Sequence, residues 1–491
     1  MTSFKFYIDG EFCDGVDGAT FDSIEPATED VWASVPEARE VDVDRAVAAA
    51  KRAFESGPWA EMTATARGRL LNKLGDILVE RAPEFAEIET RDSGKVIRET
   101  VVQARYMAGY YHYYGGLADK IEGSVPPVDK PGMMAMTYRE PLGVVAAIVP
   151  WNSQIFLTAT KLGPALAAGN TVVLKASEDA PATLLKFAEL IHEAGFPSGV
   201  INVITGFGDR CGRHLTSHPD VARVAFTGGT ETARHVVRNT AENFAVLSLE
   251  LGGKSPVMVF DDADMDSAVN GVIAGIFGAA GQSCVAGSRL LVQRNIRDEM
   301  LSRLSARAAD IRIGDPLNVE TQIGPLCTQR QRDGIESVLA ETMAAGGELI
   351  CGGQRPDGFN RGFYFSPTII ATEGDDMASY ERELFGPVLS VRTFDEEDEA
   401  IALANDSVYH YASGAFTRNL ARGMRISQKV KAGVTYLNTW RVVSPTAPFG
   451  GNKNTGYGRE GGIHAIDDYT RTKTVWINTS DEPMPDPFVM R

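Results

Sequence analysis

The sequence predicts an α/β protein built around doubly wound parallel sheets. From Gly143 onward, short apolar runs such as "GVVAAIVP", "NTVVLKAS" and "GVINVITG" alternate with helical segments such as "PATLLKFAELIHEAG". Apolar strands that alternate with helices are typical of a parallel sheet covered on both faces. The chain has 491 residues, 44% of them hydrophobic, which is too much for one small core. Two or three domains are therefore expected.

The segment before about residue 120 has a helical pattern. Apolar residues recur every three or four positions in "VDVDRAVAAAKRAFES" and along the stretch from Thr65 to Tyr114, so we expect outer helices there. Residues 121–140 contain too many prolines and glycines for a helix and predict a linker or an extended arm. Near the C-terminus, "TRTKTVWINTSDEP" alternates like an exposed strand, which suits pairing with another subunit.

Two series of strands and helices follow Gly143. The first ends with "AVLSLELGG", and the second begins near residue 252 with "SPVMVF" and runs to "GVTYLNT" near residue 438. Each series predicts one α/β domain, and the alternation of strands and helices in the first is typical of a nucleotide-binding domain.

Composition excludes several classes of function. The net charge of -17, from 65 acidic and 48 basic residues, argues against binding nucleic acid or an anionic membrane. The N-terminal stretch resembles no signal peptide, and no apolar run has the length of a membrane span. Five scattered cysteines without C-x-x-C fit neither a disulfide framework nor a zinc ribbon. We expect a cytoplasmic protein with reduced thiols.

His214 and His218 are the one pair that suggests a metal site. They are four residues apart, but Pro219 follows and there is no H-E-x-x-H motif. We expect an ordinary helix end and no metal.

Three residues are candidates for catalysis. Cys284 lies in "GAAGQSCVAGSR" among small residues, which suits an accessible nucleophile, although most free cysteines are simply small buried hydrophobes. Glu250 ends an apolar strand in "LELGGKSP" and is either a general base or a surface acid. Asn152 in "IVPWNSQ" is either an oxyanion donor or a turn asparagine. No one of these signals decides the function.

The order of the motifs is more specific. "PWN", "FTGGT", "LELGGKSP", "GQSC", "ELFGPV" and "PFGGNKNTGYGRE" follow one another along the chain. This pattern resembles the NAD(P)-dependent aldehyde dehydrogenase superfamily, and the resemblance runs from near the N-terminus to the last strand. The 34-residue separation of Glu250 and Cys284 also matches that family.

The resemblance implies an aldehyde dehydrogenase-like fold. A Rossmann-like NAD-binding domain would comprise residues 1–120 and 141–251, and a catalytic α/β domain residues 252–438. Residues 439–470 would return to complete the site. Residues 121–140 and 471–491 would form a bridging oligomerisation arm, and a homodimer or homotetramer is implied.

The resemblance also implies a reaction. The Cys284 thiolate would attack an aldehyde, and the Asn152 amide with the Cys284 backbone N–H would hold the oxyanion. Hydride transfer to the cofactor would leave a thioester, which water activated by Glu250 would hydrolyse to the carboxylic acid. Lys161 and Glu460 match a secondary proton relay and its supporting contacts.

The implied cofactor is NAD, with NADP possible. No strand is followed by G-x-G-x-x-G, and "GFGDRCG" misses that spacing by one residue. The family instead binds pyrophosphate near "FTGGTETA", where Gly229 replaces a frequent serine and Ala233 a frequent glycine. Glu178 would favour NAD, because it would repel a 2′-phosphate. The implied cofactor-binding residues are Trp151, Lys175, Ser177, Glu178, Thr227, Gly228, Gly229, Leu251, Glu383 and Phe385.

The substrate pocket departs from common family members. Ser153 replaces a frequent phenylalanine, and Thr160, Gly278 and Val443 occupy positions where bulky aromatics are frequent, which predicts a wider and more polar pocket. Arg441 in "NTWRVVSP" matches a loop at the substrate entrance, although a loop arginine is often simply solvated. We expect a polar aldehyde or semialdehyde. The implied substrate-binding residues are Ser153, Leu157, Thr160, Arg441, Val443 and Phe449.

Three alternatives remain open. A cysteine hydrolase or acyltransferase would pair Cys284 with a histidine, and the nearest in sequence is His235. A CoA-acylating dehydrogenase would pass the acyl group to CoA, which the presence of Glu250 argues against. A catalytically silent binding protein would not need Asn152, Glu250 and Cys284 together.

Overall fold

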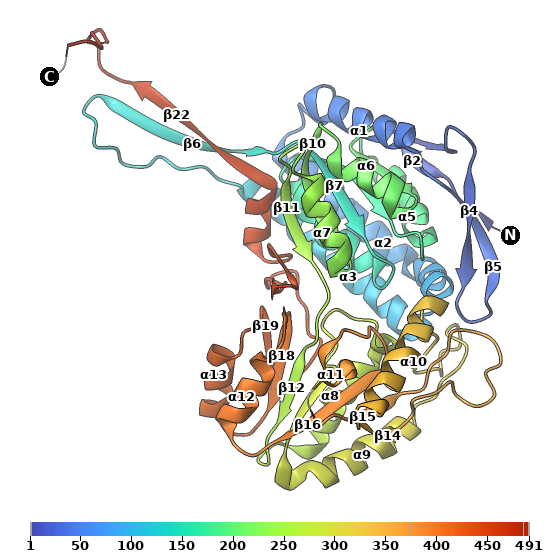
Figure 1. Cartoon of the computed structure of the whole chain (residues 1–491). Coiled ribbons are helices and arrows are strands. Elements are labelled where there is room, and N and C mark those ends of the chain that lie inside the picture. Colours follow the sequence, from blue (N-terminus) through green and yellow to red (C-terminus); the bar gives the residue numbers. More distant parts are fainter. Residues whose placement is uncertain (1, 375, 485, 490–491) are drawn as a thin grey trace.

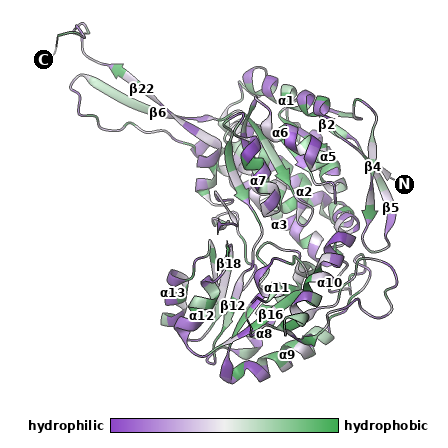
Figure 2. Ribbon diagram, viewed as in Figure 1, coloured by the Kyte–Doolittle hydropathy of each residue, from purple (hydrophilic) through white to green (hydrophobic). Residues whose placement is uncertain are grey.

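The computed structural model describes residues 2–374, 376–484 and 486–489. Two lobes, each built around one large sheet, lie against each other, and a two-stranded arm projects away from the first lobe (Figure 1). The interiors of both lobes are hydrophobic strands, and the hydrophilic residues gather on the outer helices (Figure 2). The α/β prediction is therefore confirmed.

The first lobe contains an eight-stranded sheet in the order β21-β11-β10-β7-β8-β9-β2-β3. The five central strands, β7 to β11, are parallel, and the three others run antiparallel to their neighbours. The strands are β2 (Phe6–Ile8), β3 (Glu11–Cys13), β7 (Val144–Val149), β8 (Thr171–Ala176), β9 (Ile201–Thr205), β10 (Val221–Thr227), β11 (Val246–Glu250) and β21 (Gly456–Tyr457).

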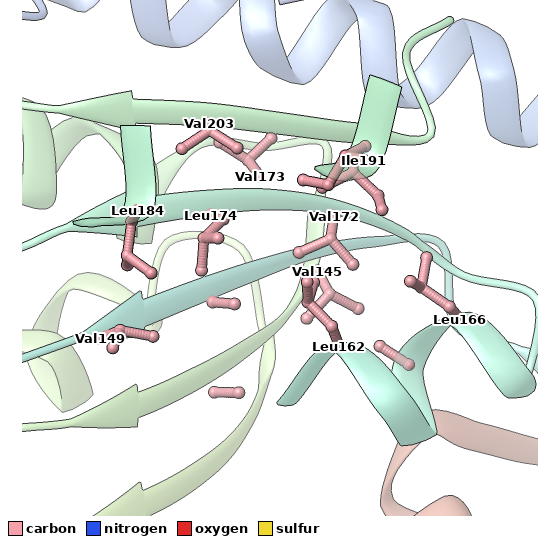
Figure 3. Packing of buried hydrophobic residues seen from close by; sticks show 14 of the residues in the cluster. Val145, Val149, Leu162, Leu166, Val172, Val173, Leu174, Leu184, Ile191 and Val203 are labelled. Atoms are coloured by element: carbon pink, nitrogen blue, oxygen red, sulfur yellow. The ribbon is translucent and has the colours of Figure 1, made fainter. Parts of the chain in front are cut away.

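Helices cover both faces of this sheet. In Figure 3, Leu162 of α4 and Ile191 of α5 lie near the strand residues Val145 and Val172, all of them buried, and α1 also packs against β7, β8 and β9. Burial on both faces explains why these strands read as unbroken apolar runs. The helices of the lobe are α1 (Glu40–Glu55), α2 (Ala64–Ser93), α3 (Ile97–Leu117), α4 (Gln154–Ala167), α5 (Ala182–Ala194), α6 (Arg213–Ser217) and α7 (Thr230–Asn239).

The strand order reverses beside β7. The chain continues from β7 to β8 and β9 on one side, whereas β10 and β11 lie on the other side. Adjacent crossovers therefore leave in opposite directions from the carboxyl ends of β7 and β10, which opens a crevice there. Residues that directly follow β7 and β10 are placed at this crevice.

The prediction of a helical N-terminal segment was wrong for residues 2–36. They form β1 (Thr2–Ser3), β4 (Thr20–Glu25) and β5 (Asp30–Pro36) in a three-stranded sheet, besides β2 and β3 of the main sheet. The helices predicted further on are present. The long helical stretch from Thr65 is divided at Gly94, whose φ of 79° ends α2 in the left-handed conformation that glycine tolerates.

The second lobe contains a seven-stranded sheet in the order β14-β15-β16-β13-β12-β18-β19. All its pairings are parallel except β14 with β15. Its strands are β12 (Pro256–Val259), β13 (Arg289–Gln293), β14 (Glu348–Cys351), β15 (Thr368–Ala371), β16 (Val388–Phe394), β18 (Ala412–Phe416) and β19 (Val434–Leu437). Its helices are α8 (Met265–Phe277), α9 (Arg297–Ala309), α10 (Gln329–Ala344), α11 (Ala378–Glu381), α12 (Glu397–Asn405) and α13 (Leu420–Lys429).

The projecting arm consists of β6 (Met133–Pro141) and β22 (Thr470–Asn478), paired antiparallel along their whole lengths (Figure 1). The chain returns to the first lobe after β19. A small pair joins β17 (Tyr409–His410) to β20 (Asn452–Lys453), and β21 then pairs with β11. Among the described residues, no helix is both long and apolar enough to cross a membrane.

Candidate active site

Cys284 follows a strained turn at the end of α8. Ala279 and Ala280 both have φ of 53°, and Gly281 has φ of 73°. A side chain at Gly281 would place its Cβ 2.1 Å from the Gly386 carbonyl oxygen, so glycine is required at this point. Three successive left-handed residues reverse the chain within one turn, and this strain lies next to the candidate nucleophile.

The turn delivers Cys284 to a cavity of about 260 Å³ between the two lobes. Asn152 and Glu250 line the same cavity, so the structure brings the three candidate catalytic residues together. They arrive from separate places: Asn152 follows β7, Glu250 ends β11, and Cys284 belongs to the second lobe. Four of the predicted substrate residues also line it, besides Arg441: Ser153, Leu157, Val443 and Phe449.

Cys284 is partly buried and is protonated in this state. Burial raises the pKa of its thiol to about 12, a hydrogen bond from Tyr411 lowers it, and the negative charge of Glu250 raises it further. Because the thiolate is the reactive form, a proton must leave this thiol before it can attack a substrate.

The Asn152 amide is held beside Cys284. Its Nδ2 donates to the carbonyl oxygen of Gln282 at 3.1 Å. Gln282 is itself fixed, because its Oε1 accepts the backbone N–H of Cys327 at 2.8 Å. Gln282 lies two residues before Cys284 in the chain. The Asn152 amide therefore has a defined orientation beside the thiol, within the cavity where an oxyanion would form.

Glu250 is buried at the end of β11. Its Oε2 accepts a hydrogen bond from the Tyr411 hydroxyl at 2.6 Å. Its Oε1 lies against Gly450, where a Cβ would come within 2.4 Å. Burial raises the pKa of Glu250 well above its usual value, and the charge of Glu460 adds to the rise. A raised pKa suits a carboxylate that takes a proton from water.

Lys161 and Glu460 form a buried ion pair behind the cavity. Lys161 Nζ also donates to the Thr227 hydroxyl at 2.6 Å, and the Thr160 hydroxyl donates to Glu460 Oε2 at 2.8 Å. Thr160 does not line the cavity. It lies one helical turn beyond Leu157, where Glu460 covers the face of α4, so its predicted place in the substrate pocket was wrong.

A second pocket of about 970 Å³ adjoins the first, and Trp151, Thr227, Gly228 and Gly229 line both. Helix α7 begins after Gly229 without a side-chain cap, so the N–H groups of its first turn are free to bind an anion. Nothing lies within 4 Å of a Cβ built at Gly229. The glycine therefore leaves this helix end open.

Lys175, Ser177 and Glu178 line the far part of the second pocket. Lys175 Nζ lies 3.2 Å from Glu178 Oε2. Burial opposes ionisation of Glu178, but the Lys175 charge and hydrogen bonds outweigh it and lower its pKa. The segment around Gly208, which lacks the G-x-G-x-x-G spacing, also lines this pocket. The spacing of its glycines did not indicate that this segment lines the pocket.

Leu251, Glu383 and Phe385 line the cavity of Cys284 and not the second pocket. Glu383 Oε1 accepts the Gly253 N–H at 2.7 Å, and burial raises the pKa of Glu383 to about 7. Phe385 has φ of 51°, and its ring meets the ring of Trp151 edge to face at 5.5 Å. Of these residues, Phe385 thus contacts Trp151, which lines both spaces.

The sequence model of the aldehyde dehydrogenase family matches residues 12–475 of the chain. The chain belongs to the aldehyde dehydrogenase family. It is 58% identical to the (Z)-2-((N-methylformamido)methylene)-5-hydroxybutyrolactone dehydrogenase of Acinetobacter baylyi, with 100% of both chains covered. The predicted family and enzyme class are therefore confirmed.

Solved structures of aldehyde dehydrogenases have the same fold. The NAD+ complex of the Bacillus cereus enzyme is 40% identical with a TM-score of 0.95, covering 97% of this chain and 96% of that one. PnpE, crystallised with nicotinamide adenine dinucleotide, is 43% identical with a TM-score of 0.96, covering 99% of both chains. The predicted aldehyde dehydrogenase fold is thus confirmed.

Arg441 lines the cavity of this aldehyde dehydrogenase. Its φ is 59°, and Nη1 donates to the Ala274 carbonyl oxygen at 3.4 Å. A Cβ at Gly278 would lie 1.8 Å from that same nitrogen. The guanidinium thus fills the space that Gly278 leaves, so Gly278 does not widen the pocket as predicted. No carboxylate among the described residues forms an ion pair with Arg441.

Sequence reasoning missed two kinds of residue. Gln103 and Met107 of α3 line the Cys284 cavity from one helix face, four residues apart. Their spacing is the only signal, and any packed helix shows it. Tyr411 contacts Glu250 from the segment before β18, and nothing in its local sequence indicated that contact.

The His214 and His218 side chains both lie near Asp44, and the described residues contain no cluster of three metal-ligating side chains.

Proposed function

We propose that this chain oxidises an aldehyde to a carboxylic acid with NAD, through covalent adducts of Cys284. The observation that supports this most is the convergence of Asn152, Glu250 and Cys284 on one cavity that opens into a second pocket at a helix N-terminus. No histidine is among the described residues lining the Cys284 cavity, which disfavours the cysteine hydrolase alternative.

The second pocket fits a dinucleotide. The uncapped start of α7 at Gly229 suits a pyrophosphate, and the Lys175 and Glu178 pair suits an adenine ribose. Similar enzymes have been crystallised with NAD. Glu383 and Phe385 would contact the nicotinamide end, because they line the Cys284 cavity, where the hydride is transferred. When bound, NAD supplies the acceptor for the substrate hydride.

The remaining chemistry belongs to this chain. After the Cys284 thiol loses its proton to solvent water, the thiolate forms a C–S bond to the aldehyde carbon, and the carbonyl oxygen becomes an oxyanion that the Asn152 amide and the Cys284 N–H stabilise. Departure of the hydride leaves a thioester. Glu250 takes a proton from water, whose oxygen attacks the acyl carbon, and the C–S bond breaks to return the thiolate. Lys161 and Glu460 carry protons away from Glu250.

The substrate is proposed to be an aldehyde that carries a carboxylate. The relative at 58% identity is named for a 5-hydroxybutyrolactone. Opening such a hydroxylactone converts the hydroxyl-bearing carbon to an aldehyde and the ring ester to a carboxylate. Arg441 lines the cavity without a carboxylate partner among the described residues, so its fork of donors is available for that group.

An aldehyde panel tests both parts of the proposal. NADH formation is followed with 4-oxobutanoate, with butanal as the neutral compound of the same length, and with benzaldehyde. We expect kcat/KM to be greatest for the acidic aldehyde. A chain that forms no NADH with any aldehyde contradicts the reaction, whereas a preference for butanal or benzaldehyde contradicts the substrate class alone.

The organisation of the chain is part of the proposal. Residues 1–120 and 141–251 bind NAD, residues 252–438 supply the nucleophile, and residues 439–470 complete the site. The arm, residues 121–140 and 471–491, pairs with another copy in a homodimer or homotetramer, which the outer edge of β22, unpaired among the described residues, favours. A cytoplasmic location stays a prediction.

A further inference from the structure

Tyr411 lies inside the active site without a part in the mechanism above. It precedes β18, and its side chain is 2% exposed. Its backbone oxygen accepts hydrogen bonds from the N–H groups of Gly433 and Val434 at 2.9 and 3.1 Å. Its ring packs against Phe449 at 5.4 Å between centroids, at the cavity wall. The residue is therefore held rigidly from both its backbone and its ring.

The hydroxyl of Tyr411 has a specific target. It donates to Glu250 Oε2 at 2.6 Å, and both groups are buried. Glu250 Oε1 has no hydrogen-bond partner among the described residues and lies against Gly450. Tyr411 is thus the one hydroxyl donor that the described residues offer to this carboxylate. The pKa of Tyr411 is raised well above its usual value, chiefly by burial, so it keeps its proton at any working pH.

We infer that Tyr411 is a positioning residue that holds Glu250 in one orientation and stabilises its carboxylate, and thereby sets the pH at which the thioester is hydrolysed. The inference rests on the proposed role of Glu250 as the base of that step. A hydrogen bond to a charged group favours the ionised form, so it makes a deeply buried carboxylate available near neutral pH.

Other charges also act on Glu250. Glu460 from the return segment raises its pKa, whereas Lys161 from α4 and Arg459 lower it. Cys284 faces it across the cavity, and Tyr411 lowers the pKa of that thiol as well. Removing the Tyr411 hydroxyl leaves Glu460, Lys161 and Arg459 in place but also acts on the Cys284 thiol, so thiol attack and thioester hydrolysis must be measured separately.

The test is Tyr411→Phe, which keeps the ring and removes only the hydroxyl. NADH formation is recorded before and during the steady state across the pH range. We expect the steady state at neutral pH to slow more than the first turnover, and the steady-state profile to shift upward by about one to two pH units. Recovery of the rate at alkaline pH is the sign of a base with a raised pKa, which a merely structural defect would not produce.

Tyr111→Phe is the matched control. Tyr111 is also fully buried, but its hydroxyl has no hydrogen-bond partner among the described residues, so this variant should keep the wild-type profile. A second variant carries 3-fluorotyrosine at position 411. The more acidic phenol donates more strongly, so its profile should move to lower pH. This opposite shift keeps the inference testable even if the phenylalanine variant folds poorly.

Glu250→Gln separates this inference from the function on which it rests. If Glu250→Gln slows the steady state but Tyr411→Phe leaves the profile unmoved, the role of Tyr411 is wrong and the base remains assigned. If Glu250→Gln slows the first turnover and the steady state equally, the base assignment itself is wrong. In the double variant, Tyr411→Phe should add no further loss, because its effect passes through the carboxylate. An additive loss overturns the inference.

Discussion

Replacing Gly278 by alanine should remove the substrate contact of Arg441 without touching Arg441. The new methyl would lie 1.8 Å from Arg441 Nη1 and 3.1 Å from its Cζ, so the guanidinium must move. Gly278 has φ of -59° and ψ of 139°, which alanine adopts without strain. The displaced group is the end of a flexible side chain, so the fold should survive.

The size of the effect follows from the lost contact. A hydrogen bond to a charged group contributes about 1.5–3 kcal/mol, which corresponds to about 10- to 150-fold in kcat/KM. We expect Gly278→Ala to lower kcat/KM by that factor for 4-oxobutanoate and to change it little for butanal. Both aldehydes are assayed by NADH formation, and the melting temperature checks that the fold is intact.

Arg441→Ala is the partner variant. It should show the same selective loss, and the double variant should be no worse than Arg441→Ala alone, because both changes remove one contact. Equal losses with the acidic and the neutral aldehyde would mean that the methyl merely blocks the cavity. An unchanged ratio between the two would show that Arg441 does not bind the carboxylate.

Three further outcomes are expected. Cys284→Ala should abolish aldehyde oxidation while NAD binding, measured by calorimetry, persists; substantial residual oxidation would exclude Cys284 as the nucleophile. The wild-type enzyme should prefer NAD, and Glu178→Gln should narrow the gap to NADP in kcat/KM, since the ionised carboxylate repels a 2′-phosphate; an unchanged gap would assign the preference elsewhere. Burial raises the pKa of Glu383 to about 7, so its carboxylate is lost as the pH falls through that value. The KM for NAD should rise there, and Glu383→Gln should remove this pH dependence; a variant that keeps it would point to another group.

The sequence predicted the parts of the fold that are buried on both faces. From β7 to β11, every strand is an apolar run between helices, so pattern and structure agree. The strands of residues 2–36 were misread because β2 and β3 have only three residues each, and β3, β4 and β5 are partly exposed without a regular alternation. Tertiary contacts form these strands, since β2 joins the main sheet only by pairing with β9, nearly two hundred residues away.

The site was predicted from motifs, and its exceptions have one physical origin. Thr160 and Gly278 were interpreted from their own sizes, yet Glu460 covers the first and Arg441 fills the space beside the second. Tyr411 reaches Glu250 across 161 positions of sequence. In all three cases the role of the residue depends on a contact with a segment far away in the sequence. A single sequence does not show which distant segments lie close together in the fold.

The arrangement of Cys284 and Glu250 bears on the order of the proposed steps. Both groups are buried in one cavity, and the charge of Glu250 raises the pKa of the thiol. Two negative charges in this space repel each other, so the pair is expected to ionise one group at a time. Attack on the aldehyde needs the thiolate, which is favoured while Glu250 is neutral. Once the thioester forms, the sulfur carries no charge, and Glu250 can ionise without that repulsion. Formation of the thioester thus allows Glu250 to ionise and act as the base in the hydrolysis that follows. The hydrogen bond from Tyr411 also favours the ionised form of Glu250.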